Sequence, residues 1–142
     1  MGAPHIGETG FASGLFYSYV CIDRDQLISN LGGNAELADL AIDALTRAAI
    51  QVAPRGKQNS FASRAYASYV LAERGNQQPR SLAVSFLRPI DGHDYGIQAV
   101  SALKTQRDDF DRTYGDCADY RYEIDAFLGE GNLDELCAFL RD

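Results

Sequence analysis

The chain has 142 residues, 46% of them hydrophobic and 23% charged, which is enough for a packed core and excludes a disordered tail. The 13 basic and 20 acidic residues give a net charge of −7 at pH 7, which excludes a uniformly basic nucleic-acid clamp. No apolar run approaches the roughly 20 residues that cross a membrane, and no secretory signal is visible. The three cysteines are an odd number without close pairing, which fits a reducing compartment. We therefore expect a cytoplasmic protein.

The first expected elements are an extended arm and a strand. Residues 4–13 are Gly-rich and polar without helical periodicity, which favours an arm or hairpin leg. Residues 14–23 carry aromatic and β-branched side chains on both alternating faces, which predicts a central, largely covered strand. Tyr17 and Tyr19 share one face of it. Stacking on RNA bases is one interpretation of this pair, and we favour the other, core packing with the hydroxyl groups at the sheet edge.

A helical region follows the strand. A short helix near residues 26–31 stops at the Gly32-Gly33 pair, and Asn34 can then cap a helix that continues to about Val52. The apolar residues of this second helix recur at helical spacing and predict one buried stripe, made of Leu37, Leu40, Ala41, Ala44, Leu45, Ala48 and Val52.

The remaining elements alternate between strands and helices. We expect a strand at 65–73, a short helix at 81–87, a longer helix at about 97–114, a strand at 120–124 and a last helix from Asn132. Glu135 stands three residues after Asn132, which is capping-box spacing. The inward positions of the longer helix are predicted to be Val100, Leu103, Phe110 and Tyr114.

This order of elements predicts an α+β fold. Strand, helix and strand form half of a split βαβ unit, so we expect a partial ferredoxin-like, RRM-like palm with C-terminal helices. Two principal strands are too few to form a stable sheet alone, and the predicted layer is therefore incomplete on its N-terminal side.

Charge is distributed unevenly along the chain. Residues 1–43 hold one basic and six acidic residues, residues 44–90 hold seven basic and one acidic, and residues 91–142 hold five basic and thirteen acidic. Eleven of the 13 basic residues are Arg, the side chain better suited to bidentate phosphate contact. The middle segment is thus either a phosphate-binding surface or a set of ordinary solvated charges.

Several short motifs occur in an order that resembles the CasC family, the backbone subunit (RAMP superfamily) of the type I-E Cascade CRISPR surveillance complex. The matching runs are His5-Ile6-Gly7, Phe11 to Tyr19, Asn30 to Gly33, Gly56-Lys57-Gln58, Pro79 to Ala83 with Phe86, Arg112 to Gly115, and Leu133 to Leu136.

The resemblance implies a non-enzymatic RNA-binding protein of antiviral defence that needs no cofactor. Copies of such a subunit stack head to tail along the CRISPR RNA and hold it by its backbone, so the implied partners are CRISPR RNA, other copies of the same subunit and other Cascade subunits. Family members are much longer than this chain. We therefore expect residues 1–13 to be a thumb-like arm, 14–90 the second half of the palm and 91–142 a C-terminal extension packed on the palm.

The principal candidate RNA contacts lie in the loop from Arg55 to Arg64. It contains Arg55, Lys57 and Arg64 together with Gln58 and no acidic residue, a set of cations and donors that suits recognition of phosphates. Lys57 and Gln58 stand at the family's Gly-Lys-Gln. The alternative explanation is the general preference of helix C-termini for cations.

Phe11 and His5 are the candidate contacts on the arm. An aromatic wedge at Phe11 could fill the gap left by a displaced base, and an apolar contact with a neighbouring subunit explains it equally well. For His5, a polar arm residue is the simpler interpretation.

Other chemistry finds little support in the sequence. The acidic run Asp108 to Asp111 fits a solvated helix face around an inward Phe110, and neither the histidines nor the cysteines show zinc-ligand spacing. No nucleophile elbow or phosphate-binding Gly-Lys-Ser/Thr loop is present, so a hydrolase is the weakest hypothesis. The stronger alternative to RNA binding is a protein–protein assembly module without RNA affinity of its own.

Overall fold

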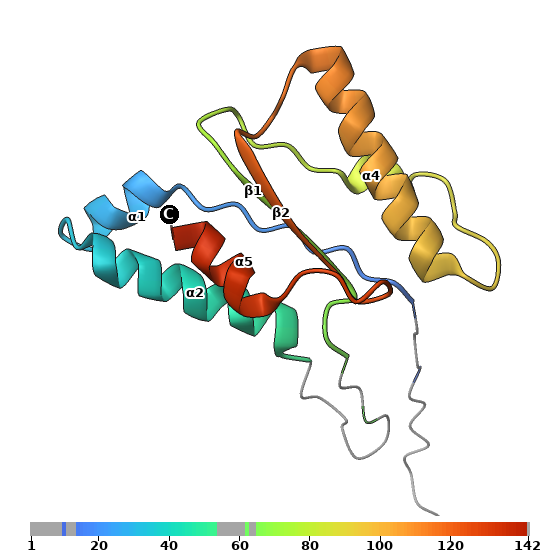
Figure 1. Ribbon diagram of the computed structural model, residues 1–142, viewed down its shortest axis with the longest axis horizontal. Helices are drawn as coiled ribbons and strands as arrows, with labels where there is room; N and C mark the ends of the chain where they lie inside the picture. The colour runs from blue at the N-terminus through green and yellow to red at the C-terminus, as the bar shows by residue number, and fades with distance from the viewer. Residues whose placement is uncertain (1–9, 11–13, 54–61, 63–64, 142) are drawn as a thin grey trace, which may run out of the picture.

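The computed structural model describes residues 10, 14–53, 62 and 65–141, and within them helices lie on both sides of a small sheet (Figure 1). The sheet consists of β1 (Tyr69–Arg74) and β2 (Tyr120–Asp125). They pair antiparallel, from Tyr69 opposite Asp125 to Arg74 opposite Tyr120. The predicted strands at 65–73 and 120–124 are therefore confirmed within a few residues, and the α+β fold class is confirmed with them.

Alternation along β2 directs neighbouring side chains to different helices. Tyr122 lies against Phe139 of α5 (Leu133–Arg141), whereas Glu123 forms ion pairs with Lys104 and Arg107 of α4 (Tyr95–Tyr114). Since successive side chains of a strand point to opposite faces, α5 covers one face of the sheet and α4 the other.

Two helices precede the sheet, and both begin at a side-chain cap. Asp23 accepts a hydrogen bond from the Gln26 amide at the start of α1 (Arg24–Asn30), and Asn34 does the same for the Leu37 amide at the start of α2 (Ala35–Gln51). The predicted helices and the Asn34 cap are confirmed. Between them Gly32 and Gly33 adopt φ values of 68° and 84°, which are strained for other residues.

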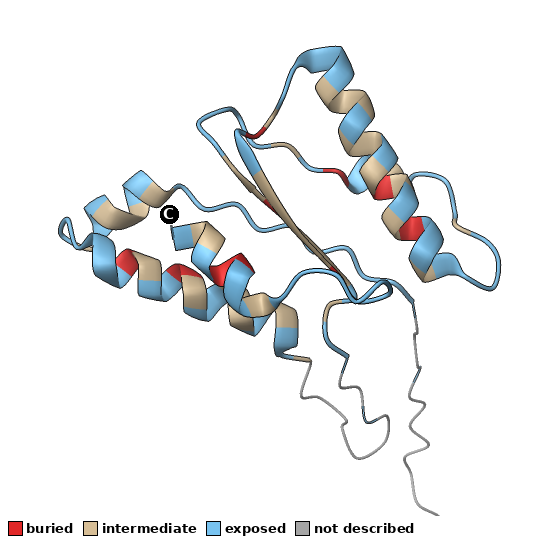
Figure 2. Ribbon diagram, viewed as in Figure 1, coloured by how far each residue is buried: buried red, intermediate tan, exposed pale blue. Residues whose placement is uncertain are grey.

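The predicted buried stripe of α2 is wrong. The residues that α2 buries are Ala38 and Ile42, and α2 packs against α5; buried positions are red in Figure 2. The predicted stripe lies on the opposite side, where Leu40 is 59% and Val52 62% exposed. The helix carries two apolar faces, and helical spacing alone does not say which one meets the rest of the chain.

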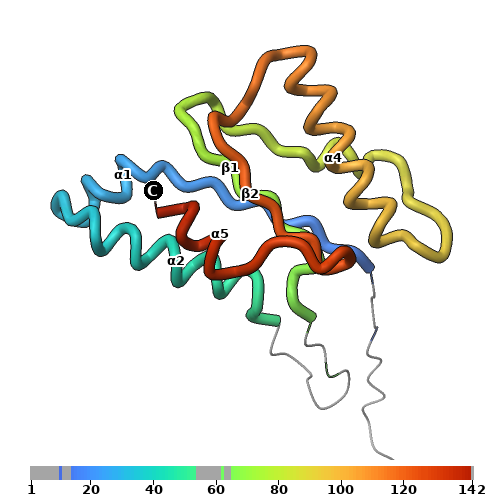
Figure 3. The backbone as a smooth tube through the Cα atoms, viewed as in Figure 1, coloured from blue at the N-terminus to red at the C-terminus, as the bar shows by residue number. Residues whose placement is uncertain are grey.

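The predicted central strand at 14–23 is also wrong. Residues 14–22 run as an extended trace past the sheet without joining it (Figures 1 and 3), and Phe16 is 86% exposed. Tyr17 is the anchor of this segment, because its ring lies 5.6 Å from that of Phe86 and its hydroxyl accepts a hydrogen bond from the Leu82 amide. Tyr19 is 46% exposed, so core packing holds in part for Tyr17 and fails for Tyr19. The segment is extended as its composition dictates, but no strand of the described residues pairs with it.

The helices of the C-terminal part follow the expected order. The predicted helix at 81–87 is a 3-10 turn, η1 (Ala83–Phe86), and the helix at about 97–114 is α4. α4 buries Leu103 as predicted, together with Ala99, whereas Tyr114 at its end is 82% exposed rather than inward.

The last helix starts with the expected cap but without the reciprocal bond of a capping box. Asn132 accepts from the Glu135 amide at 2.8 Å. The Asn132 amide instead donates to the Tyr122 hydroxyl, which donates to the Glu135 carboxylate at 2.6 Å. The Tyr122 hydroxyl thus accepts the hydrogen bond that the glutamate carboxylate accepts in a capping box, and it links α5 to the sheet.

The core is small and divided by the sheet. Its buried hydrophobic residues are Ala38, Ile42, Leu136 and Cys137 between α2 and α5, with Ala72, Leu82, Ala99, Leu103 and Ala118 elsewhere. No helix of the described residues is long and apolar enough to cross a membrane.

Candidate functional site

The six predicted RNA contacts, His5, Phe11, Arg55, Lys57, Gln58 and Arg64, lie outside the described residues. What the structure provides is the frame around the segment that holds four of them.

That frame joins the end of α2 to the start of β1. The Ala67 amide donates to the Ile50 carbonyl at 2.9 Å, which fixes the two ends of the intervening segment close together. The Ser68 carbonyl accepts from the Ala126 amide, also at 2.9 Å, which ties the start of β1 to the turn after β2. Residues 54–64 therefore connect two points that belong to one hydrogen-bonded unit.

Two basic residues of the positively charged middle segment are used inside the protein. Arg47 bonds to Asp43 and Asp134 of α5 at 2.7 and 2.8 Å. Arg74 donates to the Phe139 carbonyl and lies 5.0 Å from the centre of the Phe139 ring. Both side chains thus already have partners among the described residues, in contacts that reach α5.

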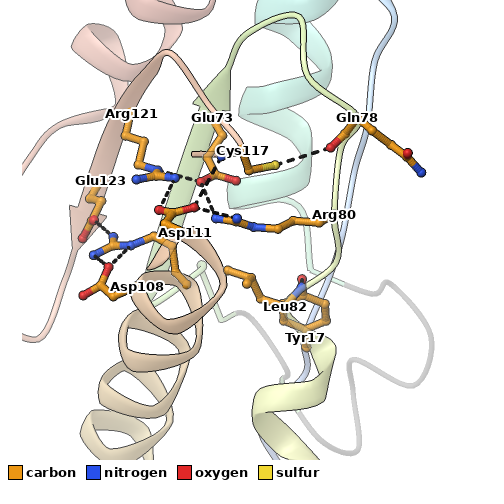
Figure 4. Close-up of polar contacts among 11 residues, drawn as sticks. Tyr17, Glu73, Gln78, Arg80, Leu82, Asp108, Asp111, Cys117, Arg121 and Glu123 are labelled. Carbon is orange, nitrogen blue, oxygen red and sulfur yellow. Dashed lines mark hydrogen bonds and ion pairs between the residues drawn. The ribbon is translucent and has the colours of Figure 1, made fainter. Parts of the chain in front are cut away.

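A third cation of the segment, Arg80, belongs to a cluster of four charged residues between the sheet and α4: Glu73, Arg80, Asp111 and Arg121 (Figure 4). Asp111 of α4 bonds to Arg80 and Arg121 at 2.6 Å each, one through each carboxylate oxygen. Glu73 bonds to Arg121 at 2.7 Å and lies 3.7 Å from Arg80. Two anions face two cations, so the cluster is neutral and connects β1, β2, α4 and the segment before η1.

The electrostatics of the cluster explain how it stays ionised although it is largely buried. Burial raises the pKa of Asp111, but the hydrogen bonds from Arg80 and the Cys117 amide and the charge of Arg121 outweigh it and leave this pKa below the usual carboxyl value. Burial likewise opposes the charge of Arg121, whose pKa is nevertheless raised because Glu73 accepts its hydrogen bond and both Glu73 and Asp111 are negatively charged. Removing one member would leave an unpaired charge in a low-dielectric site.

The acidic run on α4 pairs with arginines, and two of its carboxylates are also solvent-exposed as expected, Asp108 at 55% and Asp109 at 49%. Asp108 pairs with Arg107 and Asp109 with Arg112, at 2.8 and 2.9 Å. Asp111 is only 12% exposed, so the expectation of a solvated carboxylate is wrong for it. No group of residues that could hold a metal ion occurs among the described residues.

A second set of ion pairs lies along the same face. Glu123 of β2 bonds to Lys104 at 3.2 Å and to Arg107, and Asp125 lies 3.5 Å from Lys104. Burial raises the pKa of Glu123, but the hydrogen bonds from Tyr69, Lys104 and Arg107 outweigh burial and leave this pKa below the usual carboxyl value. α4 is therefore docked on the sheet through charges along much of its length.

One exposed cation was not singled out by the sequence. Arg88, on the loop after η1, is exposed and forms no ion pair with any residue that the structure describes. In the sequence, Arg88 is distinguished only by lying in the basic middle segment, and Arg47, Arg74 and Arg80 lie in the same segment.

A shallow hollow of about 440 Å³ lies where α4 ends, beside the cluster. It is lined by Gln77, Gln78, Pro79, Arg80, Phe110, Tyr114, Gly115, Asp116 and Cys117. The Cys117 sulfur donates to the Gln78 carbonyl at 3.5 Å, and Arg80 is neutralised by Asp111. No nucleophile paired with a general base occurs among these lining residues, so the hollow offers no catalytic arrangement.

Comparison with known proteins gives one family and one fold. A family model described as "CT1975-like protein" matches residues 1–130. Eight chains of solved structures match, among them one titled "CRISPR RNA-guided surveillance complex", with a TM-score of 0.71 and 23% sequence identity. That match covers 84% of this chain and 50% of the solved chain, so this chain spans about half of that chain's length. No curated protein matches.

Proposed function

This chain belongs to the CT1975-like family of CRISPR-associated proteins, and from that premise we propose that it is a non-catalytic component of an RNA-guided surveillance complex. The family match over residues 1–130 is the observation that carries the proposal. The shared fold with a chain of such a complex supports it. In this role the protein holds CRISPR RNA by its backbone in antiviral defence, and it stacks head to tail with other copies and contacts other subunits of the complex.

The proposed phosphate contacts are Arg55, Lys57, Gln58 and Arg64. Their support is the contrast with Arg47, Arg74 and Arg80 of the same basic segment, which pair with groups of the protein itself. A segment without an acidic residue, connected at both ends to one hydrogen-bonded frame, is suited to meeting a polyanion.

The remaining assignments are proposals of the same kind. Phe11 would act as an apolar wedge beside a displaced base, and His5 would contact RNA from the arm. Residues 14–90 would form part of an RRM-like palm, with 1–13 as a thumb-like arm and 91–142 as the extension that packs on it.

Titration of the 142-residue chain with single-stranded RNA at several salt concentrations tests RNA binding. If about three phosphates are contacted, a plot of the logarithm of RNA affinity against the logarithm of salt concentration should have a slope of about −2. Replacing Arg55, Lys57 and Arg64 by Ala should reduce both affinity and slope. A matched control is Arg112→Ala, since Arg112 is 75% exposed and pairs only with Asp109 among the described residues. Binding that is absent or independent of salt would contradict direct RNA contact by this chain.

The second candidate function is a protein–protein assembly module. The exposed apolar side of α2, with Leu40 at 59%, is the observation that favours it. It predicts association of the chain with protein partners whether or not RNA is present.

A further inference from the structure

Two of the three cysteines lie outside the core, on segments that are distant in the sequence. Cys21 and Cys117 are 96 residues apart, whereas Cys137 is fully buried in α5. Cys21 is exposed, and Cys117 is half-buried in the wall of the hollow beside the end of α4. Both thiols are therefore accessible to small reagents, and the proposed function uses neither of them.

Cys117 is held against the segment that leads into η1. Its sulfur donates to the Gln78 carbonyl at 3.5 Å (Figure 4), and its amide donates to Asp111 Oδ1 at 3.4 Å. The Cys117 sulfur therefore lies at the level of Gln78, four residues before Leu82.

Segment 14–22 passes the same place. The Tyr17 hydroxyl accepts from the Leu82 amide at 3.1 Å, which sets the two segments beside each other, and in Figure 1 they run in opposite directions. Four residues forward from Tyr17 is Cys21, and four residues back from Leu82 is Gln78. Tyr17 and Cys21 also occupy positions of the same parity in an extended chain, so their side chains share one face. Cys21 is thereby placed at the level of Gln78, on the face that Tyr17 turns toward the body.

The surroundings of Tyr19 agree with this placement. Burial is the largest cause that raises the pKa of its hydroxyl, and the charges of Cys21 and Cys117 raise it further, so both sulfurs lie near one tyrosine. Immediately after Cys21 the chain enters α1, which the 2.8 Å ion pair of Arg24 with Asp39 holds on α2. Cys21 therefore stands between two attached points, the Tyr17 side chain and α1.

We propose that Cys21 and Cys117 are a redox pair whose disulfide fastens segment 14–22 to the segment before η1. The oxidant is a low-molecular-weight disulfide such as oxidised glutathione. The exposed Cys21 thiolate attacks one sulfur of this oxidant and releases one glutathione thiolate. The Cys117 thiolate then attacks the Cys21 sulfur of the mixed disulfide and releases the second. The two protein thiols lose two protons and two electrons, and the oxidant takes up both as two molecules of reduced glutathione.

The disulfide gives a second attachment to a segment that otherwise depends on one side chain. No backbone group of residues 14–22 is hydrogen-bonded to another described backbone group, and Tyr17 holds the segment through Leu82 and the ring of Phe86. Oxidation fixes the segment on the body, and reduction restores its freedom. This proposal does not depend on RNA contact.

Oxidation of the 142-residue chain with oxidised glutathione, followed by alkylation and peptide mapping, tests the pairing. In urea the Cys117–Cys137 link should exceed the Cys21–Cys117 link by about tenfold, because a loop of 20 residues closes more readily than one of 96. In the folded chain the ratio should reverse in favour of Cys21–Cys117, and dithiothreitol should remove the link.

Three outcomes of this experiment would overturn the proposal. They are the same ratio of links in the folded and the unfolded chain, glutathione retained on both thiols without a link between them, and disulfide-bonded dimers in place of the intramolecular link.

Serine variants test the roles of the two thiols. In Cys117→Ser, Cys21 should retain bound glutathione because no second thiol displaces it, and Cys21→Ser should form no internal link with Cys117. Cys137→Ala is the control and should form the link as the unsubstituted chain does. Oxidation should raise the urea midpoint of the unsubstituted chain and of this control, since a cross-link restricts the unfolded state, and not that of the serine variants. A midpoint that is unchanged or lower after cross-linking would contradict pairing in the native fold.

Discussion

On one face of the β1–β2 sheet, α5 packs through Leu136, Cys137 and the ring of Phe139, and on the other face α4 is held through ion pairs of Lys104, Arg107 and Asp111. Burial of apolar area responds little to pH, whereas ion pairs weaken when a carboxylate is protonated and are screened by salt. We therefore expect α4 to detach from the sheet at low pH or high salt under conditions in which α5 stays packed. Each of the following predictions tests that difference.

The largest effect is expected at the apolar face. Leu136→Ala removes a fully buried side chain between α5 and α2 and leaves a cavity, so it should lower the free energy of unfolding by about 2–5 kcal/mol. Urea unfolding followed by circular dichroism measures it. Leu128→Ala, at a leucine that is 66% exposed, is the control and should cost less than about 0.5 kcal/mol. Equal losses in the two variants would show that α5 is not docked by burial.

The next effect is expected at the charged face. Asp111→Asn keeps the shape but leaves Arg80 and Arg121 without their shared anion, which should cost about 1–3 kcal/mol. Asp109→Asn is the matched control on the same helix, because the exposed pair with Arg112 contributes no more than about 0.5 kcal/mol. Hydrogen exchange should locate the loss in α4. An effect spread evenly over α4 and α5 would contradict separate attachment.

Acid should act on the α4 face in the same direction but less strongly, since the lowered pKa values leave these carboxyl groups only partly protonated at pH 3. The pKa values of Asp111 and Glu123 are lowered in the folded protein, so their contribution is present above the ordinary carboxyl values of 3.8 and 4.5. It is lost as the pH falls through the lower folded values. Unfolding measured from pH 7 to pH 3 should show this fall, and Asp111→Asn should make it shallower. If the free energy of unfolding of Asp111→Asn falls as steeply between pH 7 and pH 3 as that of the unmodified chain, Asp111 is not the source of the fall.

The smallest effect is expected at the start of α5. Asn132→Ala removes the cap of the Glu135 amide and should lower stability by about 1 kcal/mol. Asn132→Asp restores the acceptor and should recover most of it. A full loss in Asn132→Asp would mean that the amide group has another role.

Much of the fold follows from local sequence, because caps and periodicity act within a few residues. Asn34 and Asn132 mark the starts of α2 and α5, and the positions of β1 and β2 follow from alternation to within a few residues. The buried side of α2 does not follow, because the helix has apolar residues on both sides and the choice depends on α5, about ninety residues later. The predicted strand at 14–23 fails for a related reason: composition favours an extended backbone, but a strand also needs a partner to pair with.

The site was less accessible to prediction than the fold. The cluster of Glu73, Arg80, Asp111 and Arg121 joins residues far apart in sequence, and net charge by segment conceals such pairing. Segment charge counted Arg47, Arg74 and Arg80 toward an RNA surface, although each has a partner within the protein.

The hydrogen bond from Ala67 to Ile50 has a consequence for how the protein can vary. Because it closes the base of residues 54–64, those residues can be lengthened or shortened with little penalty, since doubling a flexible loop costs only about 0.6 kcal/mol. The number of residues between α2 and β1 can therefore differ among relatives without changing the hydrogen-bonded frame at its two ends. Insertions and deletions accumulating at this position, rather than substitutions in α2 or β1, would be the evolutionary record of that freedom.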